Sequence, residues 1–240
     1  MSVECGRASR ATGRHPLTPQ EIESWFDLQR ETVERVHPSW LPATDPELVV
    51  AARGTKTGRR WLANRLSSAA ALLFALPSGA GPASARELYR FEWFRPALQD
   101  PVESALDLGS LALAARLRTV VSRPAVTRLR TLLGMQRYVR ALSASPPGSA
   151  AAGMPWTTLQ TGEEIEVLVG QVLHHGAHEL AAYAGSLHPA LAESVKLSFE
   201  WGWWSSLYPT SLDPATVSAC LAVRGVCHDS PAAAHDEADT

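Results

Sequence analysis

Three neighbouring histidines have the spacing best suited to metal binding in this sequence. His174 and His178 are four residues apart, so in a helix they share one face, as two zinc ligands do. In a metalloprotease helix a glutamate directly follows the first histidine. Here His175 stands in that place, and Glu179 follows only the last histidine. We therefore interpret the cluster as histidines that lie on a helix surface or are partly buried, and we predict no metal site, with a metal-dependent hydrolase as the alternative.

Two further patterns contain the residue types of catalytic motifs in the wrong arrangement. Residues 54–58 read Gly-Thr-Lys-Thr-Gly, but a phosphate-binding loop has its lysine directly after the second glycine, so a polar turn is the better interpretation. Glu163, Glu164 and Glu166 are grouped as catalytic carboxylates would be. They also fall in the first turns of a predicted helix, where the helix dipole favours acids. We predict no catalytic residues, no cofactor and no small-molecule substrate.

Trp201, Trp203 and Trp204 form a dense aromatic group. Aromatic side chains stack on nucleic-acid bases when basic residues lie among them, but this segment has only Lys196 close by. Packing in the core is the first interpretation of the three tryptophans. A protein-binding surface is the second, because tryptophan is enriched at binding hot spots.

The net charge of −2 hides a segregation of charge along the chain. Residues 1–107 are balanced, residues 108–162 carry seven arginines and no acid, and residues 163–240 have a net charge of −9. Either the arginines lie against acids of the same chain, or they form a partner surface. For the second case we select Arg128, Arg130 and Arg137 as docking residues. A regulatory or nucleic-acid-binding module that uses the segment 116–140 is an alternative function, although we predict no nucleic-acid partner.

Helix-start signals recur along the chain and predict a mainly α fold. Each capping residue precedes apolar residues at helical spacing; these residues are Thr18, Asp45, Ser84, Asp100, Thr161 and Asp213. The apolar pattern predicts long helices over 61–76 and 100–121, and one or two helices over 125–142 that divide near Gly134. Residues 195–203 alternate apolar and other residues. We therefore expect an irregular multi-helix domain with at most a short extended segment near 195–203.

Composition divides the chain into a helical domain and two polar ends. Residues 1–16 are expected to be flexible, residues 17–225 to form the helical domain, and residues 226–240 to be an acidic, disordered tail. Residues 143–162 are rich in proline, glycine and small side chains. They are either a boundary between subdomains or a long surface loop.

Hydropathy predicts an intracellular location. The longest apolar run, Ala69 to Leu76, is shorter than the about 20 residues of a membrane-spanning helix, and no apolar stretch follows the arginines of the N-terminus. We expect a cytoplasmic protein.

Two stretches of this chain resemble the SctK-type accessory proteins of bacterial type III secretion (the YscK, OrgA and MxiK group). Residues 108–142 match that family's apolar helix with a glycine, followed by an arginine-containing half and a helix with Leu-Gly. Residues 169–201 match its glycine-started helix, proline-marked break and segment of alternating large apolar residues. The element His-Pro-Ser-Trp-Leu at 37–41 is also similar.

The resemblance implies a cytosolic adaptor of the sorting platform, peripheral to the bacterial inner membrane when assembled. Such a protein links an SctD-like protein of the inner-membrane ring to the SctQ-like protein of the cytosolic pods. It has no cofactor and no catalytic residues. This expectation agrees with the interpretation of the sequence as a non-catalytic, protein-binding helical domain.

Overall fold

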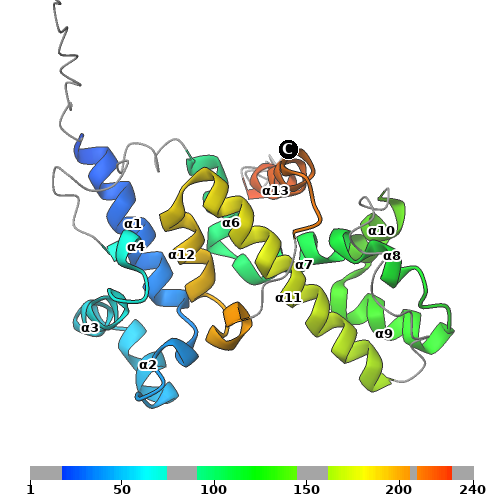
Figure 1. Cartoon of the computed structure of the whole chain (residues 1–240), viewed down its shortest axis with the longest axis horizontal. Helices are drawn as coiled ribbons and strands as arrows, with labels where there is room; N and C mark the ends of the chain where they lie inside the picture. Colours follow the sequence, from blue (N-terminus) through cyan, green and yellow to red (C-terminus); the bar gives the residue numbers. More distant parts are fainter. Residues whose placement is uncertain (1–17, 75–90, 145–161, 206–209, 229–240) are drawn as a thin grey trace, which may run out of the picture.

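The computed structural model describes residues 18–74, 91–144, 162–205 and 210–228, in which helix is the only regular secondary structure (Figure 1). The prediction of a mainly α, irregular multi-helix fold is confirmed. Several predictions lie wholly or mostly outside the described residues: the flexible N-terminus, the helix starts at Ser84 and Thr161, the linker 143–162 and the acidic tail.

The helices follow one another through short turns. In chain order they are α1 (Pro19–Arg35), η1 (Pro38–Trp40), α2 (Pro46–Arg53), α3 (Lys56–Leu66), α4 (Ala71–Phe74), η2 (Glu92–Phe94), α6 (Arg95–Gln99), α7 (Pro101–Ala112), α8 (Ala114–Leu117), α9 (Arg123–Leu133), α10 (Met135–Ser143), α11 (Gly162–Leu187), α12 (Pro189–Leu197), η4 (Trp201–Ser205) and α13 (Pro214–His228). Those labelled η are 3-10 helices.

Four of the six predicted helix starts lie in the described residues, and all four are confirmed. Thr18 and Glu21 form the reciprocal capping box of α1. The side chains of Asp45, Asp100 and Asp213 each accept a hydrogen bond from a backbone N–H in the first turn of the following helix. Gly134, at a φ of 85°, separates α9 from α10, as the sequence predicts.

Two helices predicted to be continuous are broken. The predicted helix 61–76 ends at Leu66, and α4 then begins at Ala71. Glu193 of α12 supports this separate start, because its Oε2 accepts a hydrogen bond from the N–H of Leu73 at 2.8 Å. The predicted helix 100–121 is divided at Leu113, between α7 and α8. Because this acceptor, Glu193, lies on a distant helix, the local apolar pattern gives no sign of the break between Leu66 and Ala71.

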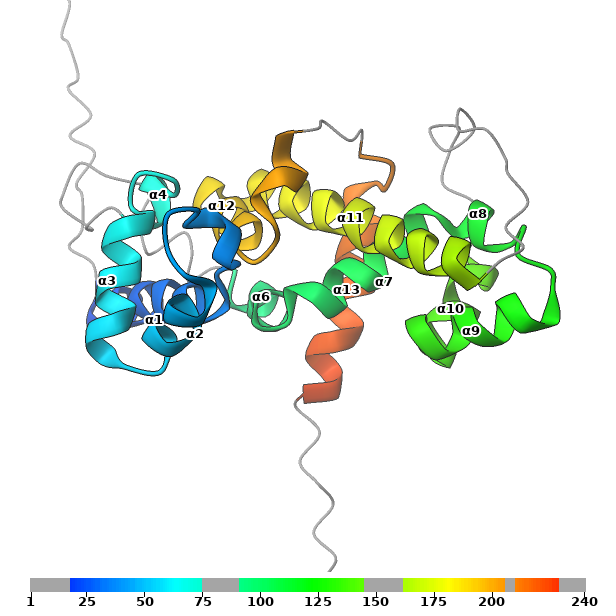
Figure 2. The same cartoon turned by 90° about the horizontal axis from the view of Figure 1, so that it is seen from below.

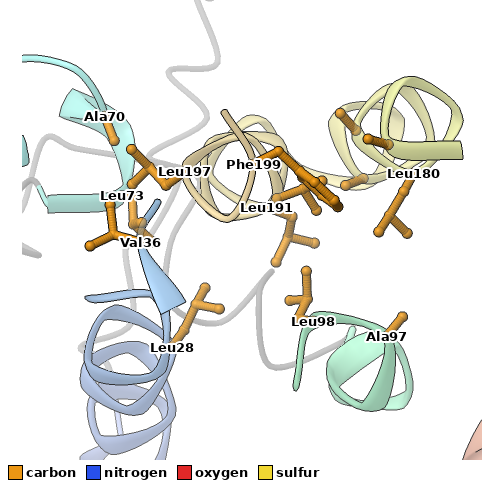
Figure 3. Packing of buried hydrophobic residues seen from close by; sticks show 14 of the residues in the cluster. Leu28, Val36, Ala70, Leu73, Ala97, Leu98, Leu180, Leu191, Leu197 and Phe199 are labelled. Atoms are coloured by element: carbon orange, nitrogen blue, oxygen red, sulfur yellow. The ribbon is translucent and has the colours of Figure 1, made fainter. Parts of the chain in front are cut away.

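The alternating segment 195–203 forms no strand. Val195 and Leu197 end α12, and η4 begins at Trp201. Val195, Leu197 and Phe199 are all buried. α12 packs against α1, α4 and α11, so it is enclosed on several sides, as Figure 3 shows around Leu191 and Leu197. Apolar residues on more than one face of a helix mimic the period of a strand.

Two hydrophobic cores lie at opposite ends of an elongated molecule (Figures 1 and 2). The first, which we call the large lobe, is formed by α1 to α4, α6, α12 and α13 together with parts of α7 and α11. The second, the small lobe, is formed by α8, α9 and α10, the first half of α11 and residues of α7. α7 and α11 therefore belong to both cores and join them.

α7 and α11 cross at a contact between two glycines. A β-carbon added at Gly176 would lie 1.6 Å from the carbonyl oxygen of Ala105, and one at Gly109 would lie 1.8 Å from that of Val172. Only glycine lets two backbones approach this closely. The joint between the lobes therefore depends on the absence of side chains at positions 109 and 176.

Candidate functional site

The histidine cluster and the tryptophan cluster, which are far apart in the sequence, meet in the large lobe. His174 and His178 lie one turn apart on α11, with ring centroids 5.1 Å apart. The Nε2 atoms of His174 and His178 lie 3.3 and 3.0 Å from the carbonyl oxygen of Trp203. Because a carbonyl oxygen only accepts, both Nε2 atoms carry the hydrogen and donate it.

Aromatic rings cover the two imidazoles. The ring of Trp203 lies 4.8 Å from that of His174, and the ring of Trp204 lies 4.9 Å from that of His178. Phe199 stacks on Trp203 with a centroid distance of 5.6 Å and an interplanar angle of 23°. The first interpretation of Trp203 and Trp204, packing in the interior, therefore fits their half-buried positions.

The environment disfavours charge on two of the histidines. Burial lowers the pKa of His178 below its ordinary value of 6.5, and electrostatic interactions with His174 and Lys196 add to this, against the opposing hydrogen bond to Trp203. Burial likewise lowers the pKa of His175, with His174, His178 and Arg116 as further causes. Both environments therefore favour the neutral form of the imidazole.

Glu179, the carboxylate next to the cluster, is directed to a different contact. Its Oε1 accepts hydrogen bonds from the N–H and hydroxyl of Ser211, at 2.5 and 2.9 Å, and from the N–H of Leu212. Burial raises the pKa of Glu179 above its ordinary value, and these hydrogen bonds oppose the shift. Within the described ranges, no three His, Cys, Asp or Glu side chains are grouped to hold a metal ion. The cluster's geometry is that of a clasp that holds η4 on α11.

An exposed aromatic corner lies beside this clasp and joins η1 to η4. The N–H of Trp201 donates to the hydroxyl of Ser39 at 2.8 Å, and Nε1 of Trp40 donates to the carbonyl oxygen of Phe199 at 2.9 Å. The rings of Trp40 and Trp201 meet edge to face at 6.4 Å. Trp201 is 61% exposed, so it is the predicted docking tryptophan with the most accessible surface. The sequence signalled each segment but not their pairing.

Arg137, selected above as a docking residue, makes ion pairs within the small lobe. Its Nε lies 2.7 Å from Asp107 and its Nη2 lies 2.6 Å from Glu103, both on α7, and its side chain is only 13% exposed. Burial alone lowers the pKa of Arg137, but the hydrogen bonds and charges of Asp107 and Glu103 raise the pKa overall. This arginine therefore has an internal role, fixing α10 on α7.

The other arginines divide between internal and exposed positions. Arg118 donates to the carbonyl oxygens of Leu142 and Ala144 at the end of α10. Arg128 pairs with Glu166 at the surface, and the guanidinium of Arg130 lies over the ring of Tyr138 at 5.4 Å. Arg128 and Arg130 are both exposed on α9, so the docking prediction now concerns these two.

The remaining candidates have structural positions. In segment 54–58 the hydroxyl of Thr55 accepts a hydrogen bond from the N–H of Gly58 at 3.0 Å and caps α3. The predicted turn is therefore confined to Gly54 and Thr55, and residues 56–58 form the first turn of α3. Glu164 and Glu166 lie in the first turns of α11, as expected.

No protein-family model, curated protein or solved structure matches this chain. The resemblance to SctK-type proteins therefore stays a prediction. Among the described helices, none is long and apolar enough to cross a membrane.

Proposed function

We propose that this protein is a non-catalytic adaptor of a bacterial type III secretion system, linking an SctD-like ring protein to an SctQ-like pod protein. The observation that carries the proposal is the two-lobed body. Each lobe has its own hydrophobic core, and the shared helices α7 and α11 hold the lobes at opposite ends. An adaptor needs two separate surfaces held at a fixed spacing.

The two lobes differ in their exposed aromatic side chains. The large lobe exposes Trp93 and Trp201. The small lobe exposes arginines on α9, including Arg128 and Arg130, beside aliphatic residues such as Val121. Aromatic surfaces supply binding energy, whereas charged surfaces contribute mainly to specificity and association rate.

The contacts of the candidate catalytic residues also support an adaptor. His174 and His178 hold the backbone of η4, and Glu179 holds the segment before α13. The resemblance covers residues 108–142 and 169–201, which contribute to the small lobe, to the joining helices and to α12. The protein would work in the cytoplasm beside the inner membrane, where ring and pod meet.

The test is affinity co-purification of the tagged full-length chain from the bacterium that encodes it, after mild cross-linking. We expect ring and pod subunits of the secretion system to be recovered together. An unrelated helical protein with the same tag is the control. Recovery of neither subunit would overturn the assignment. Recovery of nucleic acid that declines steeply with added salt would favour the regulatory alternative instead.

A further inference from the structure

An apolar groove of about 450 Å³ lies between α2 and α3. These two helices stand at the end of the large lobe (Figure 1). Leu48, Ala51 and Ala52 line it from α2, and Thr57, Gly58 and Trp61 line it from α3. Leu48 is 54% exposed although it is a large apolar residue. Neither the histidine cluster nor the aromatic corner contributes to this groove.

The side chains that line the groove suit one face of a helix. At its floor, α2 and α3 are in close contact, since a β-carbon added at Gly58 would lie 2.2 Å from the carbonyl oxygen of Ala52. Leu48 and Trp61 are the largest side chains that line it. Small residues between large ones form the kind of groove into which an amphipathic helix places apolar side chains at i, i+3 or i+4, and i+7.

The lining offers little to a small polar molecule. Its hydroxyl groups belong to Thr55 and Thr57, and that of Thr55 already caps α3. Small-molecule sites usually combine an apolar wall with several convergent polar groups. The lining therefore favours apolar side chains of a protein over a metabolite.

The charged residues around the groove indicate which charge a partner would carry beside its apolar face. α3 carries Lys56, Arg59, Arg60 and Arg65 and no acidic residue, whereas α2, the other wall, carries one acid, Glu47, and one base, Arg53. Arg59 is directed to Glu34 at 3.6 Å, whereas Lys56, Arg60 and Arg65 are exposed. The guanidinium of Arg65 lies 5.7 Å from the ring centroid of Trp61, so positive charge borders the groove itself. A partner with carboxylates beside its apolar face complements the α3 side of this rim.

We propose that the groove between α2 and α3 binds an acidic amphipathic helix of a partner protein. Apolar side chains of that helix fill the space between Leu48 and Trp61, and its carboxylates face Lys56, Arg60 and Arg65. The inference rests on the adaptor function, for which it supplies one binding surface and the chemistry of the segment bound there.

The test compares two substitutions on the same helix in the full-length chain. Ala51→Glu places a carboxylate in the groove at an exposed position, and Val50→Glu is the matched control, because Val50 is 57% exposed but does not line the groove. The probe is a fluorescein-labelled helical peptide with leucines at groove spacing and glutamates elsewhere, measured by fluorescence anisotropy. A second peptide carries lysine in place of every glutamate.

We expect the glutamate peptide to bind the wild-type chain, with an affinity that falls as salt is added. Ala51→Glu should lower its affinity about tenfold or more, because a carboxylate desolvated beside like charges is unfavourable. Val50→Glu should change it less than about threefold, because an exposed charge is mostly screened. The double variant Lys56→Glu with Arg60→Glu should bind the glutamate peptide more weakly and the lysine peptide more tightly than the wild type does. Circular dichroism should show the same helix content in all variants.

Several outcomes would overturn the inference. Equal affinity for both peptides would remove the role of charge, and equal binding by Ala51→Glu and the wild type would place the peptide elsewhere. A dimer seen by light scattering and lost in Ala51→Glu would assign the groove to a second copy. If the peptide bound only after Asp236→Ser, Glu237→Ser and Asp239→Ser were combined in one variant, the occupant of the groove would be the chain's own acidic end.

The adaptor proposal can be distinguished from the groove by the same variants. If the wild-type chain and Ala51→Glu recover ring and pod subunits equally well, the groove is wrong and the adaptor stands. If the wild-type chain recovers neither subunit, the adaptor function is wrong whatever the peptide result.

Discussion

The large lobe and the small lobe are built from different patterns of contact along the chain. The core of the small lobe comes from residues 106–141 and the first turns of α11, and it is mostly aliphatic. The core of the large lobe joins α1 to α12 and η1 to η4, and it includes Trp25, Phe94 and Phe199. The hydrogen bond from the N–H of His37 to the carbonyl oxygen of Leu197 at 2.7 Å is one such distant closure. Long-range contacts of this kind generally slow folding, so the small lobe is expected to form first.

The lobes also use arginine differently. In the small lobe, Arg137 pairs with acids of α7, since residues 108–162 contain none. In the large lobe, Arg95 of α6 pairs with Glu31 and Asp27 of α1. Each ion pair joins two helices. Both lobes expose arginines, on α9 and on α3, but only those of α9 belong to a segment, 108–162, that has no acids. Charge segregation in the sequence therefore combines an internal clamp with an external surface.

The largest expected effect is at the joint between the lobes. Gly176→Ala should lower the free energy of unfolding by about 3 kcal/mol, because α7 and α11 must move apart to admit one methyl group. Gly170→Ala is the control on the same helix, where an added β-carbon meets nothing within 4 Å. It should raise stability by about 0.5–1 kcal/mol through helix propensity. Urea denaturation measures both, and similar stability of the two variants would contradict the close crossing.

A smaller effect is expected from the clamp of the small lobe. Arg137→Met should lower the free energy of unfolding by about 2 kcal/mol, since it leaves Asp107, 8% exposed, without its closest ion-pair partner. Arg128→Met removes an exposed pair with Glu166 and should change stability by less than about 0.5 kcal/mol. Thermal unfolding of the two variants separates the internal arginine from the surface arginine. Equal losses of stability in the two variants would mean that Arg137 is no more important to the fold than the surface residue Arg128.

The smallest expected effect is the pH dependence of the clasp in the large lobe. Because burial lowers the pKa of His178 in the folded state, the unfolded chain binds a proton first as pH falls below about 6.5. The contribution of His178 to the free energy of unfolding is fully present above that pH, and it is lost as the pH falls toward the folded-state pKa. The pKa of Glu179 is raised in the folded state, so its protonation changes stability in the opposite direction. The comparison is therefore between the wild type and His178→Gln over the same pH range. The variant should lose less stability on acidification, and a greater loss in the variant would contradict the account.

Local features were predictable from sequence, and distant pairings were not. The caps at Thr18 and Asp100 depend on residues within one turn, so their sequence signal is complete. The acceptor that starts α4 is Glu193, 120 residues from Leu73, and no local pattern indicates it. The site shows the same division. The helical spacing of His174 and His178 was evident, but their contact with Trp203 required the fold of α12 and η4. Arg137 could not be separated from Arg128 without knowing where α7 lies.

Co-purification with variants disabled at one lobe shows whether the two lobes bind different partners. Arg128→Glu with Arg130→Glu changes the exposed small-lobe surface and leaves the Arg137 clamp intact. Trp201→Ala with Ala51→Glu changes the surface of the large lobe. We predict that each variant stays folded and loses one of the two subunits, ring or pod, while retaining the other. Loss of the same subunit by both variants, or of none by either, would contradict the two-ended adaptor.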